Sequence, residues 1–371
     1  MKYQEIRRKT KKIMVGSVGI GGDSPIAIQS MTNTNTADFV ATERQIRELT
    51  ERGCDIVRVT VPDMEAAETI WKLKKSNISI PIVADIHFDY RLALKCAEYG
   101  VDKIRINPGN IGDDERVREI CVACKERKIP IRIGVNSGSL EKHILEKYHA
   151  PTPTALCESA MYHIKLLEKY DFDDIVISIK ASDVNSMVQA NRLLASKVCY
   201  PLHLGVTEAG SYRTGLVKSA IGIGGLLADG IGDTIRVSLT DNPLLEIDTA
   251  HEILNALAIE GQSGMNIVSC PTCGRTKIDL ISLVRRFEEA VDRENLRMVP
   301  IHVALMGCAV NGPGEAREAD IGIAGGQGEA LLFSHGEIIG KIKEQDIIDV
   351  LISKIKEWEK EREINGRERI L

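Results

Sequence analysis

Residues 81–107, PIVADIHFDYRLALKCAEYGVDKIRIN, contain one full repeat of the pattern that decides the fold. A short apolar run, PIVADIHF, is followed by a stretch with helical spacing and then by a second short run, KIRIN. Short apolar runs separated by helical stretches are typical of parallel strands joined by helical crossovers. This segment therefore predicts a strand, a helix and a second strand in one parallel sheet.

The same alternation extends from about residue 26 to about residue 255 and gives eight strand-like runs. Eight units over roughly 230 residues fit a TIM (βα)8 barrel better than an open Rossmann sheet, which normally has fewer strands and a dinucleotide fingerprint. The glycine-rich stretch 222–233 precedes a strand instead of following one, so we interpret it as structural. The runs begin near Ile26, Asp55, Pro81, Lys103, Ile129, Asp174, Pro201 and Asp233.

The chain has 371 residues, more than one hydrophobic core usually serves. We expect an α/β barrel domain over residues 1–260 and a small α+β domain over residues 261–371. We interpret the basic start of the chain as a solvated arm that leads into a plug hairpin near residues 13–22. In the second domain the pattern predicts helices near 279–295 and 344–362, and strands near His302, Ile321, Ala330 and Ile338.

Charge and composition narrow the range of partners. The net charge of -5 gives no overall field for nucleic acid, and an aromatic content of 4% argues against a stacking platform for single strands. No apolar run approaches the roughly 18 residues that a membrane helix needs. Nine cysteines without a secretion signal point to a reducing compartment. We therefore expect a cytoplasmic enzyme that binds neither nucleic acid nor membrane.

Polar residues recur near the carboxyl end of nearly every predicted strand. Residues two apart on a strand point the same way, so each row can face one side of the sheet. A single arginine would be a surface ion pair, but this repetition favours an inward pocket for a phosphorylated small molecule. The rows are Arg58 with Thr60, Asp85 with His87, Arg105 with Asn107, Arg132 with Gly134 and Asn136, Lys180 with Ser182, His203 with Gly205 and Thr207, and Arg236 with Ser238, and Glu208 follows Thr207.

A candidate metal site follows the barrel. Cys270 and Cys273 form a CxxC motif in IVSCPTCGR, and MGCAVNGPGEAR brings Cys308 and Glu315. Three thiolates and a carboxylate can complete four-fold ligation. Zinc would normally take a fourth Cys or a His, and only His302 keeps a Cys3His site open. Thiolates in turns rich in Gly and Pro favour a 4Fe-4S cluster, because backbone amides there can point at the sulfur atoms.

The other cysteines are interpreted as packing residues. Cys121 and Cys124 form a second CxxC, but they lie in a helical pattern with no third ligand nearby. The remaining four are isolated within apolar segments, and a free cysteine commonly behaves as a small buried hydrophobe. They are Cys54, Cys96, Cys157 and Cys199.

The sequence closely resembles the bacterial 4-hydroxy-3-methylbut-2-enyl diphosphate synthase family of the methylerythritol phosphate route to isoprenoids. The resemblance covers nearly the whole chain. It implies an iron-sulfur oxidoreductase that opens and dehydroxylates 2-C-methyl-D-erythritol 2,4-cyclodiphosphate with two electrons from flavodoxin or ferredoxin, and a head-to-tail homodimer. It is carried by the motifs QSMTNT, ADIHF, RINPGN, GVNSGSL, HLGVTEAG, CPTCGR and GCAVNGPGEAR.

The resemblance also implies roles for individual residues. The cluster ligands map onto Cys270, Cys273, Cys308 and Glu315, and Glu208 is the candidate general acid. The substrate contacts map onto Arg58, Arg105, Arg132, Lys180, Arg236 and Ser238, with polar support from Asp85, His87, Asn107, Asn136 and His203.

Two rival functions remain open from the sequence. A cluster-dependent hydro-lyase acting on a small phosphorylated substrate would share the metal site but need no external electrons. A zinc-ribbon regulatory or nucleic-acid-binding protein would share the cysteines but contain zinc in place of iron.

Overall fold

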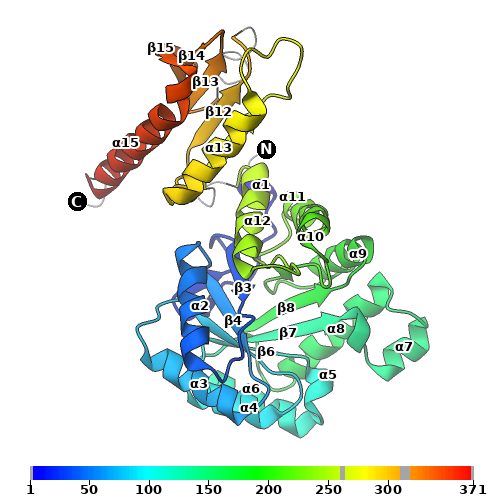
Figure 1. Ribbon diagram of the computed structural model, residues 1–371. Coiled ribbons are helices and arrows are strands. Elements are labelled where there is room, and N and C mark those ends of the chain that lie inside the picture. The colour runs from blue at the N-terminus through cyan, green and yellow to red at the C-terminus, as the bar shows by residue number, and fades with distance from the viewer. Residues whose placement is uncertain (1–2, 260–263, 310–317, 369–371) are drawn as a thin grey trace. The chain divides into compact units, whose positions relative to one another are not determined.

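The computed structural model describes residues 3–259, 264–309 and 318–368 (Figure 1). The chain divides into two compact units, Met1–Gly261 and Gln262–Leu371. Each unit has a hydrophobic core of its own, so each buries enough apolar surface to be treated as a domain.

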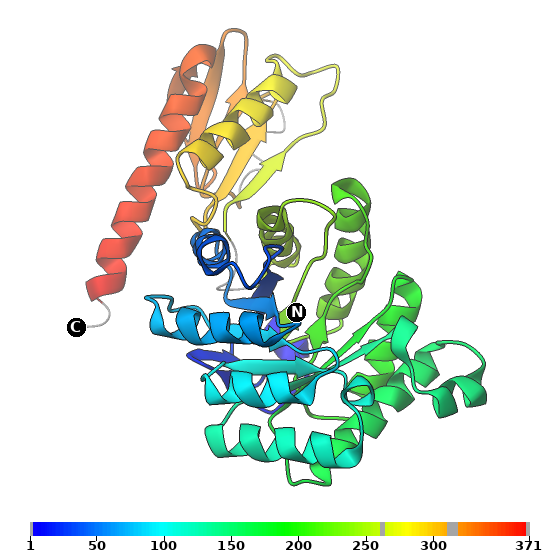
Figure 2. The same cartoon turned by 60° about the horizontal axis from the view of Figure 1, so that its bottom comes forward.

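The first unit is a nearly closed parallel barrel of eight strands, which confirms the predicted fold class (Figures 1 and 2). The strand order is β8-β7-β6-β5-β4-β3-β10-β9, and a bridge between Ile177 and Leu202 joins the two ends of the sheet. All eight predicted strands are present. They are β3 (Ala27–Met31), β4 (Ile56–Thr60), β5 (Ile82–Asp85), β6 (Lys103–Ile106), β7 (Ile131–Asn136), β8 (Ile175–Lys180), β9 (His203–Leu204) and β10 (Thr234–Ile235).

The two faces of the barrel strands have opposite chemistry. On β6, Ile104 and Ile106 pack into the large core beneath the surrounding helices, whereas Lys103 and Arg105 alternate with them. Because side chains alternate along a strand, the charged residues of the barrel strands share the inner face. The barrel interior above the plug is therefore polar, and the large apolar core lies outside the sheet.

The helices that cover the barrel start at well-defined caps. Asp38, Asp63, Asp89, Asp113 and Asp183 each accept a hydrogen bond from a backbone amide in the first turn of the next helix. These caps fix where each chain segment leaves the mouth of the barrel. The helices are α2 (Phe39–Glu51), α3 (Met64–Lys75), α4 (Tyr90–Glu98), α5 (Pro108–Ile111), α6 (Asp114–Arg127), α7 (Lys142–Tyr148), α8 (Pro153–Glu168), α9 (Val184–Ala195), α10 (Tyr212–Ser219), α11 (Gly225–Ala228) and α12 (Pro243–Ala256).

A hairpin of β1 (Ile13–Val15) and β2 (Val18–Ile20) plugs the amino-terminal end of the barrel. Its apolar side chains pack against the first inward residues of several strands, among them Ala27 and Ile56. The plug hairpin was predicted, but the solvated arm before it was wrong. Arg8 donates hydrogen bonds to the carbonyl oxygens of Val198 and Tyr200, and a short helix α1 (Tyr3–Ile6) precedes it. The arm is therefore bound to the barrel floor.

The second unit is a five-stranded mixed sheet in the order β11-β12-β13-β14-β15 (Figure 1). The first three strands are parallel and the last two antiparallel. Side chains of both helices, including Phe287 and Leu351, pack with the sheet in one core. The elements are β11 (Asn266–Ser269), α13 (Leu280–Arg293), β12 (His302–Met306), β13 (Ile321–Gly325), β14 (Glu329–Ser334), β15 (Glu337–Lys343) and α15 (Ile347–Glu368).

One strand and one cysteine differ from the expectations. β11 was not predicted, and Cys199 is exposed although it was expected to pack. The other cysteines interpreted as packing residues are buried, including both members of the second CxxC on α6. Within the described ranges, the structure contains no helix that is both long and apolar enough to pass through a membrane.

Candidate active site

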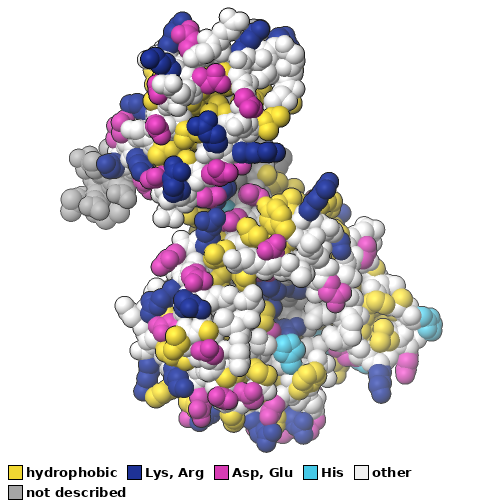
Figure 3. Space-filling view, viewed as in Figure 1, with side chains coloured by type: hydrophobic (Ala, Val, Ile, Leu, Met, Phe, Trp, Pro, Cys, Tyr) yellow, Lys and Arg dark blue, Asp and Glu magenta, His cyan; other side chains and the backbone are white. Residues whose placement is uncertain are grey.

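A pocket of about 170 Å³ opens at the carboxyl ends of the barrel strands. Figure 3 shows it as a hollow in the barrel unit, with Lys and Arg side chains inside and a histidine at its edge. In TIM barrels this end of the sheet is where active sites lie. The pocket is lined by Arg58, Asp85, His87, Arg105, Arg132, Gly134, Asn136, Ser178, Lys180, Thr207, Arg236 and Ser238.

The pocket carries a large excess of positive charge. Its lining includes four arginines and one lysine but a single carboxylate, Asp85. Arg105 Nη1 lies 3.0 Å from Asp85 Oδ1, and Arg58 Nε lies 3.6 Å from Asp85 Oδ2. Burial alone would raise the pKa of Asp85, but the two arginines outweigh it and lower the pKa to about 2. Asp85 thus holds two guanidinium groups and Glu246 pairs with Arg236, which leaves Arg132 and Lys180 without a carboxylate partner among the described residues.

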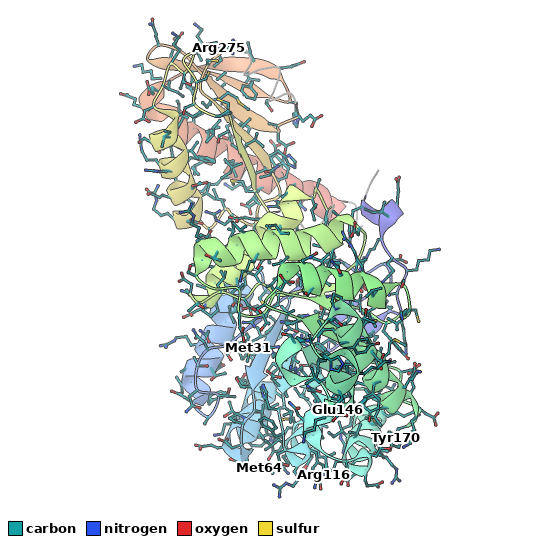
Figure 4. The ribbon with its side chains drawn as sticks, turned by 90° about the vertical axis from the view of Figure 1, so that its right-hand side faces the viewer. Met31, Met64, Arg116, Glu146, Tyr170 and Arg275 are labelled. Carbon is teal, nitrogen blue, oxygen red and sulfur yellow. The ribbon has the colours of Figure 1, made fainter. Side chains whose placement is uncertain are left out.

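Arg132 and Arg236 each have a hydrogen-bond partner that is not part of the pocket wall. Arg132 Nη1 donates a hydrogen bond to Gln29 Oε1 over 3.3 Å, and Arg236 Nη2 donates to Glu246 Oε1 over 3.1 Å. Arg58 also contacts the sulfur of Met31, at the end of β3 (Figure 4). Supports of this kind keep a flexible side chain in one rotamer, which preorganises a binding site.

Gly134 makes room for one of these side chains. A Cβ atom at this position would lie 2.5 Å from Arg105 Nε, closer than any real contact. Glycine on the inner face of β7 thus leaves room for the guanidinium of Arg105, which lies against it while Nη1 reaches Asp85 on the opposite neighbouring strand β5. Gly134 is the first residue of GVNSGSL, one of the motifs that carry the family resemblance.

Two predicted substrate-binding residues are not among the lining residues of the pocket, although both are described and buried. Asn107 caps the short helix α5 through Gly109 N and donates to Ser139 Oγ over 3.2 Å. His203 Nδ1 bonds Thr234 Oγ1 over 2.7 Å, deeper in the barrel. The structure thus gathers the predicted arginines, Lys180, Asp85, His87, Asn136 and Ser238, and it sets Asn107 and His203 apart.

Glu208 lies in the loop after β9, directly after Thr207 of the pocket wall. Its side chain is exposed, and its backbone has a φ of +52°. A non-glycine residue in this left-handed region is uncommon and costs free energy. Glu208 is therefore adjacent to the pocket wall in sequence but is not one of its lining residues.

Three buried residues of the barrel unit, one in the pocket wall and two outside it, were missed by sequence reasoning. Ser178 lines the pocket two residues before Lys180, and the period-two rule would have found it. Glu246 is buried on α12, where it also accepts a hydrogen bond from Ser30 Oγ. Lys103 is fully buried on the inner face of β6. Neither Glu246 nor Lys103 lies at the carboxyl end of a strand, so the strand-end pattern gave no signal.

We predict that Asp85→Asn lowers the free energy of unfolding by about 3 kcal/mol, because the buried Arg58 and Arg105 lose their counterion. The variant should also bind sulfate more tightly than the wild type, since its pocket has one negative charge fewer. Thermal melting with and without sulfate measures both effects. An Asp102→Asn variant, whose carboxylate pairs with the half-exposed Lys74, is the control. Equal stability of the Asp85 variant and the wild type would contradict this account.

The same carboxylate predicts a pH dependence. In the folded state the pKa of Asp85 is about 2, below its ordinary value of 3.8. A depressed folded pKa stabilises the fold above the unfolded pKa, and the stabilisation is lost as the pH falls from about 4 to about 2. The difference in melting temperature between the wild type and Asp85→Asn should therefore shrink across that acid range.

The predicted metal ligands lie in the second unit. Cys270 follows β11 and Cys308 follows β12, and these two strands are parallel neighbours. The backbone amide of Gly307 donates to the sulfur of Cys270 over 3.2 Å, so the two turns touch. Because parallel strands end at the same edge of a sheet, the topology places both thiols at one edge.

Cys273 lies in the loop after Cys270. The backbone amide of Arg275 (Figure 4) lowers the pKa of the Cys273 thiol, which favours the thiolate that a metal needs. Within the described ranges, no three acidic, His or Cys side chains already form a metal-binding group. The fourth predicted ligand, Glu315, lies outside the described residues. The thiols lie in turns, and backbone amides lie close to their sulfur atoms. This arrangement fits an iron-sulfur cluster.

Comparison with known proteins places both units in one family. The GcpE TIM-barrel domain matches residues 10–251, and the GcpE protein C-terminal domain matches residues 266–357. A relative from Fusobacterium nucleatum is 57% identical over 95% of this chain and 98% of its own length. One from Clostridium perfringens is 58% identical over 93% of this chain and 98% of its own length. Both are named 4-hydroxy-3-methylbut-2-en-1-yl diphosphate synthase (flavodoxin).

Solved structures support the fold alone. The HPPK-DHPS of Plasmodium falciparum aligns with a TM-score of 0.51 and 12% identity, over 76% of this chain and 54% of that one. The family evidence comes from the sequence matches, which cover nearly the whole chain at high identity. Both domain matches and both relatives agree, so this chain belongs to the GcpE family.

Proposed function

We propose that this chain reduces 2-C-methyl-D-erythritol 2,4-cyclodiphosphate to 4-hydroxy-3-methylbut-2-enyl diphosphate. The reaction opens the ring, takes up two electrons and two protons and releases one water. The observation that carries the proposal is the pocket itself, where five cations and one carboxylate surround about 170 Å³. Guanidinium groups match the oxygens of a diphosphate, and the relatives named above are synthases of that product.

The arginines have two roles in this proposal. They hold the diphosphate in the ground state, and they stabilise the charge that appears on the phosphate oxygen when the ring opens. Their supports, Asp85, Gln29 and Glu246, hold them in place before the substrate arrives. The binding set is Arg58, Arg105, Arg132, Lys180, Arg236 and Ser238, with His87, Asn136, Asn107 and His203 as polar support.

Glu208 donates the proton to the departing hydroxyl group. Its position beside the pocket wall puts a carboxyl group at the mouth, where a substrate held by the arginines would present its carbon skeleton. Cys270, Cys273, Cys308 and Glu315 hold the 4Fe-4S cluster, which supplies the electrons when bound. Flavodoxin or ferredoxin reduces the protein, and the thiol ligands suit a reducing cytoplasm.

The active protein is a head-to-tail homodimer, in which the second unit of one chain covers the barrel mouth of the other. Such an arrangement removes water from the pocket, and interactions between the arginines and an anion are stronger in a site without water. It also covers Glu208, which is exposed within a single barrel unit.

The test is anaerobic purification, iron and sulfide analysis, and an assay with the cyclodiphosphate and dithionite as reductant. The proposal expects a brown protein and product formation that depends on the reductant. Conversion of the cyclodiphosphate to a dehydrated product of the same oxidation level, without reductant, would instead indicate a hydro-lyase. A colourless protein that contains zinc and forms no product would indicate the zinc-binding alternative.

A further inference from the structure

Lys103 lies inside the barrel, on the same face of β6 as Arg105 but one step further from the mouth. Its side chain is fully buried, and its Nζ atom has no hydrogen-bond partner among the described residues. A buried ammonium group without an acceptor is costly, whereas a neutral amine in the same place is tolerated. Lys103 does not line the pocket and has no role in the function proposed above.

The surroundings of Lys103 are positive on nearly every side. The inner face of the barrel presents arginines from β4, β6 and β7, Arg236 directly after β10, Lys180 from β8 and His203 from β9. Three carboxylates are buried among the described residues, Asp85 of β5, Glu246 of α12 and Asp233, which directly precedes β10. Gln29 of β3 is neutral, and the plug hairpin presents apolar side chains to the barrel. All three carboxylates already pair with arginines, Asp233 with Arg7.

Charge therefore opposes protonation of Lys103 as long as the pocket holds no anion. Burial is the main cause that lowers the pKa of Lys103 well below its ordinary value, and the positive charges of Arg132 and Arg58 lower it further. Arginines keep their protons in proteins, so a buried lysine among them is the group that loses its proton. Lys180 is subject to the same forces, but it reaches the pocket and touches whatever binds there.

We propose that Lys103 is a charge-regulating group of the pocket: it is neutral when the pocket is empty and takes up a proton from solvent when a dianion binds. The ligand brings two negative charges into the ring of arginines, and in a low-dielectric interior these charges act on Lys103 across one layer of side chains. Protonation then adds one positive charge beneath the ligand. Binding and proton uptake are thereby linked, so affinity for the anion falls as the pH rises.

This inference rests on the proposed function for its choice of ligand. Each phosphorus of the cyclodiphosphate carries a single, strongly acidic hydroxyl group, so the ligand is a dianion throughout the neutral range and exchanges no proton itself. Any proton taken up on binding therefore comes to the protein. Sulfate has the same property and serves as a second probe that does not depend on the identity of the substrate.

The experiment is calorimetric titration of the full chain, purified without oxygen and kept without reductant, in buffers of different ionisation enthalpy. Binding of the cyclodiphosphate at pH 8 should take up roughly half a proton or more, and Lys103→Met should lose most of this uptake. Lys125→Met, which removes an exposed lysine on α6, should leave the uptake unchanged. The dependence of affinity on pH should flatten in the Lys103 variant alone.

The outcomes separate this inference from the function on which it rests. Binding of the cyclodiphosphate without proton uptake by the wild type overturns the role of Lys103, whether or not the variant folds. Equal uptake by the wild type and a folded Lys103→Met variant also overturns it and assigns the proton to Lys180 or His203. Failure to bind the cyclodiphosphate overturns the proposed function, and sulfate then tests the linkage by itself. A purely structural lysine would change none of these proton counts.

Discussion

Cys270→Ser is expected to lose the iron and sulfide of the protein and to lower turnover of the cyclodiphosphate by roughly 100-fold or more. Even outer-shell partners of a metal site are typically worth about 10- to 100-fold, and Cys270 is proposed as a direct ligand. Its sulfur also accepts the amide hydrogen of Gly307, a contact that ties it to the turn before Cys308. Iron and sulfide analysis, the visible spectrum and the reductant-dependent assay measure the effect.

The chain contains matched controls for this substitution. Cys199→Ser changes an exposed thiol outside the candidate metal site, and Cys124→Ser changes the second CxxC motif on α6. Both should retain iron, although the second should melt at a lower temperature because Cys124 is fully buried. Retention of iron and activity by Cys270→Ser, or loss of iron from Cys124→Ser, would move the metal site away from the second unit.

The barrel could be predicted from sequence because its strands are short and apolar on one face, and most of them are followed by a helix with a side-chain cap. On β4 the outward residues Val57 and Val59 belong to the large core, while Arg58 between them turns inward. An arginine in such a run is conspicuous in the sequence. The rows at the strand ends therefore predicted most of the pocket wall.

The pattern could not predict how deep each inward residue lies. β9 is only two residues long, and His203 pairs with Thr234, which itself pairs with Ala27 at the start of β3. His203 therefore lies low in the barrel although its row resembles the others. Lys103 is the first residue of β6, and the sequence pattern gave it no role. Only the closed barrel shows that this first residue lies inside it.

Other differences come from residues with a local partner that competes with the site. Asn107 follows β6 as a pocket residue should, but Gly109 turns the chain at once and the Asn107 side chain caps that turn.

β11 has two exposed residues and no clear alternation, so its pairing with β12 decides its structure. Such long-range pairing is not visible in a short window of sequence.

Glu208→Gln is expected to lower turnover of the cyclodiphosphate by about 100-fold or more, the range that positioned acid-base groups typically supply. The amide has nearly the same shape and cannot donate the proton that the departing hydroxyl needs. Affinity for the cyclodiphosphate and the spectrum of the cluster should not change, because the side chain lies outside the pocket wall. Steady-state kinetics and calorimetric binding separate the two effects.

Glu146→Gln is the matched control, since Glu146 is an exposed glutamate on α7 of the same unit (Figure 4). It should leave turnover unchanged. Turnover within twofold of the wild type in Glu208→Gln would remove Glu208 from the mechanism, and equal losses in both variants would point to a general effect of lost charge.

The backbone at Glu208 allows a second, independent test of the same role. Glycine adopts a φ of +52° without strain, so Glu208→Gly should be no less stable than the wild type, with relief of strain offsetting the extra freedom of the unfolded chain. If the glutamate is present only to shape the loop, glycine should serve as well and turnover should persist. If its carboxyl group donates the proton, the glycine variant should melt normally and still be as inactive as Glu208→Gln. This pair of variants therefore separates the contribution of the Glu208 side chain from that of its backbone.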